Sequence, residues 1–241
     1  MRAAIVTGVS RGLGKALAAT LLARDFTVLG VGRSSPPDLT GSYEFVRFDL
    51  AQAGETDQRL TAALSVLASR KPESVCLVNN AAIAAPVGTL GRLEAREIAA
   101  SLMVNLAAVV ALANLFCRIF SDASIGRRII NVSSGAAQNA LPGDGVYCVA
   151  KAGMEMLTRT LAAEQKDAGF RAITVRPGVI DTDMQTFSRS QSPDVLPSVE
   201  MFIGFHREGR LVPPEVVAAK IVDKLIIGEV EHGRTYSYAE L

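Results

Sequence analysis

Residues 3–14 read AAIVTGVSRGLG, and this stretch decides the fold. The apolar run Ala3–Thr7 leads into a turn with glycines at 8, 12 and 14, and leucines from Leu13 to Leu22 then recur at helical spacing. A second apolar, β-branched run, Thr27–Val31, follows. Strand, glycine turn, helix and strand within about thirty residues form a βαβ unit, which requires the two strands to be parallel.

The same alternation continues to the end of the chain. Continuous apolar strands that alternate with helices predict a parallel sheet covered on both faces. We therefore predict one α/β domain over residues 1–241, a Rossmann-type doubly wound fold with about seven parallel strands. Further strands are expected at 45–48, 75–78, 128–132, 171–175 and 234–238, and further helices at 56–69, 98–120, 146–165 and 213–225.

The least regular stretch of the chain is 183–211, which is rich in serine and proline. It follows a strand end, where ligands bind in such sheets, and long irregular segments in compact domains are usually functional. We interpret it as a lid over the substrate.

The bulk composition excludes several classes of protein. Of the 241 residues 49% are hydrophobic and the net charge is +1, so neither disorder nor a nucleic-acid-binding surface is indicated. Three cysteines without a CxxC pair indicate neither a disulfide framework nor a metal site, and they favour a reducing, cytoplasmic location. The apolar segment 98–120 contains Asn105 and Asn114, which favours a core or subunit-interface helix over a membrane span.

The glycine turn indicates a dinucleotide site. Glycine allows a tight turn and lets backbone N–H groups approach a pyrophosphate at the N-terminus of a helix. An ordinary strand–helix turn is the alternative, but all three glycines fit the close approach. The residues assigned to this contact are Gly8, Ser10, Arg11, Gly12, Leu13 and Gly14.

The end of the second strand indicates which dinucleotide binds. Enzymes that use NAD usually carry an acidic residue there to hold the ribose hydroxyls, but this chain reads Val31-Gly32-Arg33-Ser34. Arg33 and Arg11 could both bond a 2′-phosphate, which favours NADP(H), although either one could be a solvated surface arginine. Asp49 is expected to accept a hydrogen bond from the adenine amino group, with Leu50 beside it.

Three residues form the candidate catalytic group. Tyr147 and Lys151 are four residues apart on an expected helix and so share a face, and Ser134 ends the preceding strand. A hydride that moves onto a carbonyl carbon leaves negative charge on the oxygen, which Ser134 could stabilise and Tyr147 could protonate. We expect the Lys151 ammonium to lower the pKa of Tyr147 and to hold the nicotinamide ribose. Ser133 is the alternative hydroxyl, and only spacing favours Ser134.

These motifs resemble those of the short-chain dehydrogenase/reductase family. TGVSRGLG at 7–14, NNAA at 79–82, VSSG at 132–135, YCVAK at 147–151 and RPGVIDTDM at 176–184 occur in the family's order. The resemblance implies catalysis by Ser134, Tyr147 and Lys151, with Asn105 holding a proton-relay water near Lys151. It also implies cofactor contacts from Asn80, Ala81, Ala82, Pro177, Gly178, Ile180 and Thr182, together with Tyr147 and Lys151. The family has glycine where this chain has Ala82, and that methyl group narrows the space beside the ribose.

YCVAK and PGVIDTDMQ are more specifically similar to the sepiapterin reductase branch, which includes benzil-type reductases. That branch implies reduction of a vicinal dicarbonyl or an α-hydroxyketone. The family also implies a homodimer or homotetramer built partly on the helices at 98–120 and 146–165. A non-catalytic NADP(H) sensor is the alternative function. A sugar-nucleotide epimerase is disfavoured, because the chain after the PG segment is too short for a second substrate domain.

Overall fold

The computed structural model describes residues 1–241 and contains one seven-stranded sheet. All strand pairs are parallel, in the order β3-β2-β1-β4-β5-β6-β7. The predicted doubly wound fold is therefore confirmed. The strands are β1 (Arg2–Thr7), β2 (Phe26–Gly32), β3 (Tyr43–Arg47), β4 (Ser74–Asn79), β5 (Gly126–Val132), β6 (Phe170–Arg176) and β7 (Thr235–Ser237).

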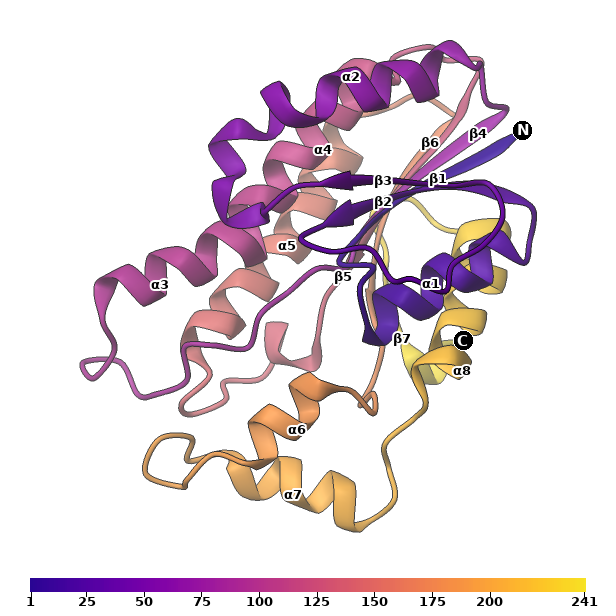
Figure 1. Cartoon of the computed structure of the whole chain (residues 1–241). Coiled ribbons are helices and arrows are strands. Elements are labelled where there is room, and N and C mark those ends of the chain that lie inside the picture. The colour runs from indigo at the N-terminus through magenta and orange to yellow at the C-terminus, as the bar shows by residue number, and fades with distance from the viewer.

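Helices cover both faces of the sheet (Figure 1). One face packs against α2 (Thr56–Ser69), α4 (Ala108–Ile119) and α5 (Gly145–Glu164), and the other against α1 (Gly12–Leu22) and α8 (Pro214–Lys220). Alternate residues of a strand point into the two hydrophobic cores, one on each face of the sheet. Ile5 of β1 belongs to the first core and Val6 to the second, and both are fully buried. This two-sided burial explains why the strands read as continuous apolar runs.

The long helix predicted at 98–120 is present but is not uniform. It consists of α3 (Ala95–Leu102), a π-helical turn η2 (Met103–Ala107) and α4. Residues 95–119 are long and apolar enough to cross a membrane, a weak signal that core helices also give. Leu112, Leu115 and Phe116 are buried in the core that α4 shares with α2 and the sheet, which accounts for that apolarity.

The segment predicted to be irregular, 183–211, contains two short helices. They are α6 (Asp183–Arg189) and α7 (Val199–Arg207), which lie below the sheet in Figure 1 and pack on each other. The irregular assignment was wrong because both prolines and all the serines except Ser188 lie outside these helices, which leaves the helical stretches free of proline. The two ends of this segment lie side by side. Asp181 N donates to Val212 O (3.0 Å), and Val212 N donates to Val179 O (2.9 Å).

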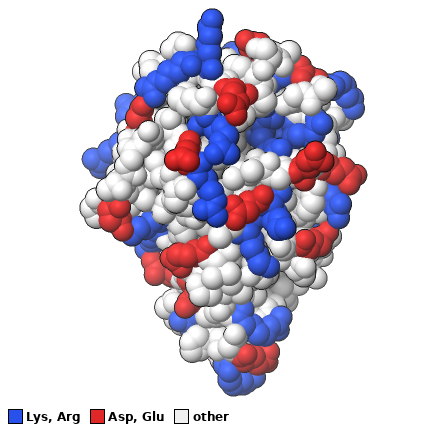
Figure 2. Space-filling view, turned by 90° about the vertical axis from the view of Figure 1, so that its right-hand side faces the viewer, with Lys and Arg blue, Asp and Glu red and all other residues white.

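Charges of both signs mix on the surface that carries α1 and α8. Figure 2 shows basic and acidic side chains interleaved over this face. Lys15 of α1 pairs with Asp38 at 2.7 Å, and Arg24 pairs with Asp223 at 3.1 Å. The mixture agrees with the net charge of +1.

Candidate functional site

The predicted site residues gather at one edge of the sheet. In a parallel sheet the loops that follow the strands share an edge, and ligands bind where the strand order reverses, here between β1 and β4. The loops after β1, β4 and β6 carry the residues expected to contact the cofactor: Gly8, Ser10, Arg11, Gly12, Leu13, Gly14, Asn80, Ala81, Ala82, Pro177, Gly178, Ile180 and Thr182. Arg33 follows β2, and Asp49 and Leu50 follow β3.

Two neighbouring loops fix the shape of the glycine turn. Thr7 Oγ1 accepts hydrogen bonds from the backbone N–H groups of Asn80 and Ala81, both at 3.0 Å, and Asn80 Nδ2 donates to Thr7 O (2.9 Å). Gly8 has φ +73°, and a Cβ there would lie 2.9 Å from Ala81 Cα. A Cβ on Gly14 would overlap the carbonyl of Gly8. The turn therefore requires glycine at both positions, and it leaves its backbone open to a pyrophosphate at the start of α1.

The two arginines proposed for a 2′-phosphate have different surroundings. Arg33 is exposed and makes no ion pair, and no acidic residue stands beside it at the end of β2. Arg11 Nη1 lies 2.7 Å from Asp183 Oδ2, so the glycine turn is bridged to the first residue of α6. Both partners are more than 70% exposed, so the pair contributes little to stability and can exchange for another anion.

Asp49 and Thr182 border the same region. The Asp49 carboxylate accepts a hydrogen bond from Ala51 N (3.0 Å) as the N-cap of the following 3₁₀ turn. Thr182 packs against Gly12, where a Cβ would lie 3.3 Å from its methyl carbon. The loop after β6 thus closes onto the glycine turn from the opposite side.

The two serines at the end of β5 point to different partners. Ser133 is buried, and its hydroxyl donates to Glu155 Oε1 (2.8 Å), which also accepts from Arg176 Nε (2.8 Å). Ser134 caps a 3₁₀ turn, and its hydroxyl also hydrogen-bonds toward Tyr147. Of the two serines, geometry favours Ser134 as the candidate catalytic hydroxyl, because the Ser133 hydroxyl is occupied by its hydrogen bond to Glu155, which forms an ion pair with Arg176.

Tyr147 and Lys151 lie together on α5 beneath the strand ends. Lys151 is 1% exposed, its Nζ donates to Val132 O (2.7 Å), and it lies 5.4 Å from the centre of the Tyr147 ring. Burial lowers the pKa of Lys151 to about 8. The Tyr147 hydroxyl is 4.0 Å from Met184 Sδ at the start of α6.

The expected effect of Lys151 on the pKa of Tyr147 was wrong for this structure. Burial raises that pKa above its ordinary value and the charge of Asp144 raises it further, while the hydrogen bond from Ser134 acts in the opposite direction. The Lys151 ammonium is not among the influences on this pKa, and desolvation of the phenolate is the largest of them. The phenol is thus held in its protonated form at neutral pH, the form that a proton donor needs.

Asn105 holds the backbone of Ile83, a role different from the water binding that the resemblance implies. It is fully buried in the π turn η2, where its Oδ1 accepts from Ile83 N (2.9 Å) and its Nδ2 donates to Ile83 O (2.8 Å). The amide makes no hydrogen bond to Lys151, so its part in a proton relay stays a prediction. The side chain ties the loop after β4 to the helix that packs on α5.

Sequence reasoning missed two groups near the site. Tyr238, in the C-terminal tail, packs against Gly178 of the loop after β6, and Glu240 accepts from Ser237 and Arg234 to hold that tail in place. Asp144 directly precedes α5 and is 5% exposed, and its charge raises the pKa of Tyr147. A single acid at a helix start gives no signal in sequence, because such residues are ordinary caps.

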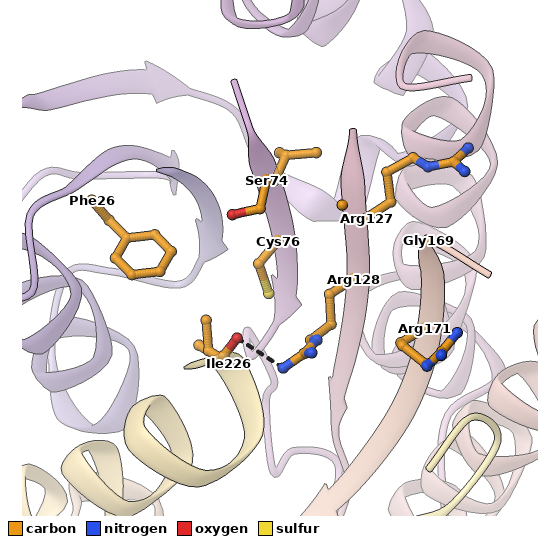
Figure 3. Close-up of a pocket in the computed structure, with 10 residues that line it drawn as sticks. Phe26, Ser74, Cys76, Arg127, Arg128, Gly169, Arg171 and Ile226 are labelled. Carbon is orange, nitrogen blue, oxygen red and sulfur yellow. Dashed lines mark hydrogen bonds between the residues drawn. The ribbon is translucent and has the colours of Figure 1, made fainter. Parts of the chain in front are cut away.

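A cavity of about 100 Å³ lies at the opposite edge of the sheet, away from these residues (Figure 3). Arg128 points to the end of η4 (Ile221–Ile227), the π-helical segment that continues α8, and its Nη1 donates to Ile226 O (2.8 Å) and Gly228 O (3.0 Å). Arg171 donates to Ala168 O and Phe170 O. Both arginines donate to backbone carbonyls and so stabilise the fold.

Comparisons with known proteins identify the family. The short chain dehydrogenase family model matches residues 2–193. A benzil reductase ((S)-benzoin forming) of Bacillus cereus is 32% identical over 97% of both chains, and a sepiapterin reductase of Bos taurus is 31% identical over 95% of this chain and 91% of its own. The crystal structure of the KRED1-Pglu enzyme superposes with a TM-score of 0.85 at 29% identity, covering 98% of this chain and 100% of its own. The chain therefore belongs to the short-chain dehydrogenase family, the nicotinamide-dependent oxidoreductases of carbonyl and alcohol groups.

Proposed function

We propose that this protein is an NADPH-dependent carbonyl reductase that converts a vicinal dicarbonyl or an α-hydroxyketone to the alcohol. One observation carries the proposal. Ser134, Tyr147 and Lys151 lie together at the sheet edge that also carries the glycine turn. The substrate class is supported by the similarity over nearly the whole chain to benzil and sepiapterin reductases.

The chain's own residues divide the chemistry between them. Ser134 and Tyr147 would donate hydrogen bonds to the substrate carbonyl oxygen, which makes the carbonyl carbon electrophilic. The reduced nicotinamide supplies the hydride. As negative charge grows on the oxygen, Tyr147 gives up its proton, and the product is the neutral alcohol. Lys151 would hold the nicotinamide ribose, and its charge would stabilise the phenolate left after the transfer.

The preference for NADPH rests on the end of β2. Arg33 is exposed and unpaired there, and no carboxylate is available for the ribose hydroxyls. Arg11 would add a second guanidinium once it leaves Asp183. In the same proposal the enzyme works in the cytoplasm, where its three free thiols would stay reduced.

We also propose a homodimer or homotetramer formed through α4 and α5. Val110 of α4 is 43% exposed, and Val149 and Met156 of α5 are 61% and 52% exposed. Burial of these side chains by a second copy would explain their exposure in the single chain. Sedimentation of the purified protein tests this directly, and a monomer at micromolar concentration would contradict it.

The decisive test of function is turnover. The protein is mixed with NADPH or NADH and a panel of diketones, hydroxyketones and aldehydes, and the loss of reduced-nicotinamide absorbance is followed. We expect turnover of vicinal dicarbonyls, with kcat/KM higher for NADPH than for NADH. Tight NADPH binding with no turnover across the panel would instead identify a non-catalytic NADP(H) sensor.

A further inference from the structure

Asp144 is a buried carboxyl group that has no partner in the protein. The residue is only 5% exposed, and its carboxylate makes neither a hydrogen bond nor an ion pair within the protein, but its oxygens are not fully enclosed. An aspartate at an N-cap usually accepts from the N–H of the second or third helical residue, and Asp144 does not. Most of the side chain is therefore enclosed, while the carboxylate oxygens stay free of protein partners and accessible to a small molecule.

The surroundings of Asp144 supply no compensating charge. The loop that carries it is held by Gly88 N, which donates to Gly143 O (2.8 Å), and by Ser198 Oγ, which donates to Pro142 O (3.0 Å). Leu196 and Pro197 of the segment between α6 and α7 close against Gly143. None of these neighbours is basic. Burial is the only influence on the pKa of Asp144 and raises it to about 6.

The position of Asp144 relative to the reacting group is the second observation. Tyr147 is the third residue of α5 and Asp144 is its N-cap, so the two side chains begin within one helical turn. The charge of Asp144 acts on the Tyr147 phenol. The free carboxylate and the phenol that would protonate the substrate therefore start from the same turn of α5.

We propose that Asp144 is a specificity-determining residue that hydrogen-bonds the second oxygen of the substrate, on the carbon next to the reacting carbonyl. The inference rests on the proposed function. A protonated Asp144 would donate to the second carbonyl of a dicarbonyl, and an ionised Asp144 would accept from the hydroxyl of an α-hydroxyketone. The protein leaves this group unpartnered because the partner arrives with the substrate.

The test compares two substrates that differ only in that oxygen. Benzil and deoxybenzoin share a skeleton, but one carbonyl of benzil is a methylene group in deoxybenzoin. The wild-type protein, Asp144→Asn and Asp144→Leu are assayed on both with NADPH. The ratio of kcat/KM values is compared between variants, which cancels the different intrinsic reactivities of the two ketones.

We expect Asp144→Leu to lower kcat/KM for benzil about tenfold or more and to change that for deoxybenzoin by less than about threefold. Asp144→Asn, which can still donate and accept, should keep most of the preference. The exposed lid residue Asp194 provides the matched control, and Asp194→Leu should leave both substrates unchanged. An equal loss on both substrates with Asp144→Leu, or an unchanged ratio, overturns the proposal.

Failure of the proposed function has a different signature. In that case the wild-type protein reduces neither ketone, and the role of Asp144 is measured by binding. Benzil should then raise the melting temperature of the wild-type protein more than that of Asp144→Leu, while deoxybenzoin affects both equally. Equal stabilisation of the two proteins by benzil would reject Asp144 as the recognition group.

Discussion

The two edges of the sheet differ in one respect: some polar groups at the carboxyl edge lack protein partners, whereas the arginines at the amino edge have them. At the edge formed by the amino ends of the strands, the amino edge, Arg128 donates to Ile226 O (Figure 3). Arg171 donates to Phe170 O, and Arg127 pairs with Asp167 at 2.9 Å. At the carboxyl edge, Asp144 has no partner and Tyr147 has only a hydrogen bond toward Ser134 and a long contact to Met184. Satisfied groups stabilise the fold, whereas groups with spare hydrogen-bonding capacity are available to a ligand.

Removal of the Tyr147 hydroxyl should have the largest effect and should leave the fold unchanged. Tyr147→Phe takes away the proton donor but keeps the ring beside Lys151. We expect kcat to fall by about two to four orders of magnitude, with NADPH affinity preserved. Steady-state kinetics and NADPH fluorescence titration measure the two quantities. Tyr236→Phe in β7 serves as the control, and a fully active Tyr147→Phe enzyme would remove this residue from the mechanism.

Neutralising Asp144 should stabilise the protein. The folded-state pKa of about 6 lies above the ordinary 3.8, so the folded state holds the proton more tightly than the unfolded state. The resulting stability is full below about pH 4 and is lost as pH rises through 6. Asp144→Asn escapes that loss, and its free energy of unfolding at pH 7 should exceed the wild-type value by up to about 3 kcal/mol.

Urea denaturation at several pH values between 4 and 7 measures this difference between variant and wild type. The difference should grow as pH rises through 6 and then stay constant. Asp194→Asn, at an exposed position, should show no such trend. A difference that is independent of pH would mean that the carboxyl is not desolvated as the structure indicates.

At the amino edge a substitution should act on stability alone. Arg128→Met removes the guanidinium that donates to the carbonyls at the end of η4. We expect the free energy of unfolding to fall by about 2 kcal/mol, because charge-assisted bonds are lost and the carbonyls stay half-buried. Arg96→Met, at an exposed site without partners, is the control. A changed KM for the carbonyl substrate would show that the two edges are coupled.

The smallest expected effect concerns the Arg11–Asp183 pair at the carboxyl edge. Asp183→Asn frees Arg11 without altering the size of the side chain. Because exposed pairs contribute at most about 1 kcal/mol, the KM for NADPH should fall by no more than about fivefold, and that for NADH should stay the same. Asp181→Asn, two residues away, is the matched control. Equal changes with both cofactors would exclude Arg11 as a 2′-phosphate ligand.

Most of the fold could be predicted from the spacing of apolar residues along the chain. The strands from β1 to β7 and the helix at 56–69 follow from apolar runs and helical spacing, because each must cover a face of one sheet. The helices α6 and α7 did not follow, since segments of seven and nine residues depend on contacts with each other.

The site was predictable only where neighbours along the chain define it. Glycine spacing and the four-residue step from Tyr147 to Lys151 are local patterns. The pairing of Arg11 with Asp183 joins residues 172 positions apart, and no local pattern encodes it. The desolvation that raises the pKa of Tyr147 likewise depends on the assembled fold.

The opposite side-chain directions of Ser133 and Ser134 limit which insertions and deletions this protein can tolerate. Successive residues at the end of β5 face opposite ways, one toward Glu155 and the other toward Tyr147. A single codon gained or lost just before this pair would exchange their directions, so that the catalytic position receives a neighbour's side chain and the ion pair loses its hydroxyl. Length variation should therefore be tolerated in the connection between α6 and α7 and forbidden at this strand end, whatever the substrate.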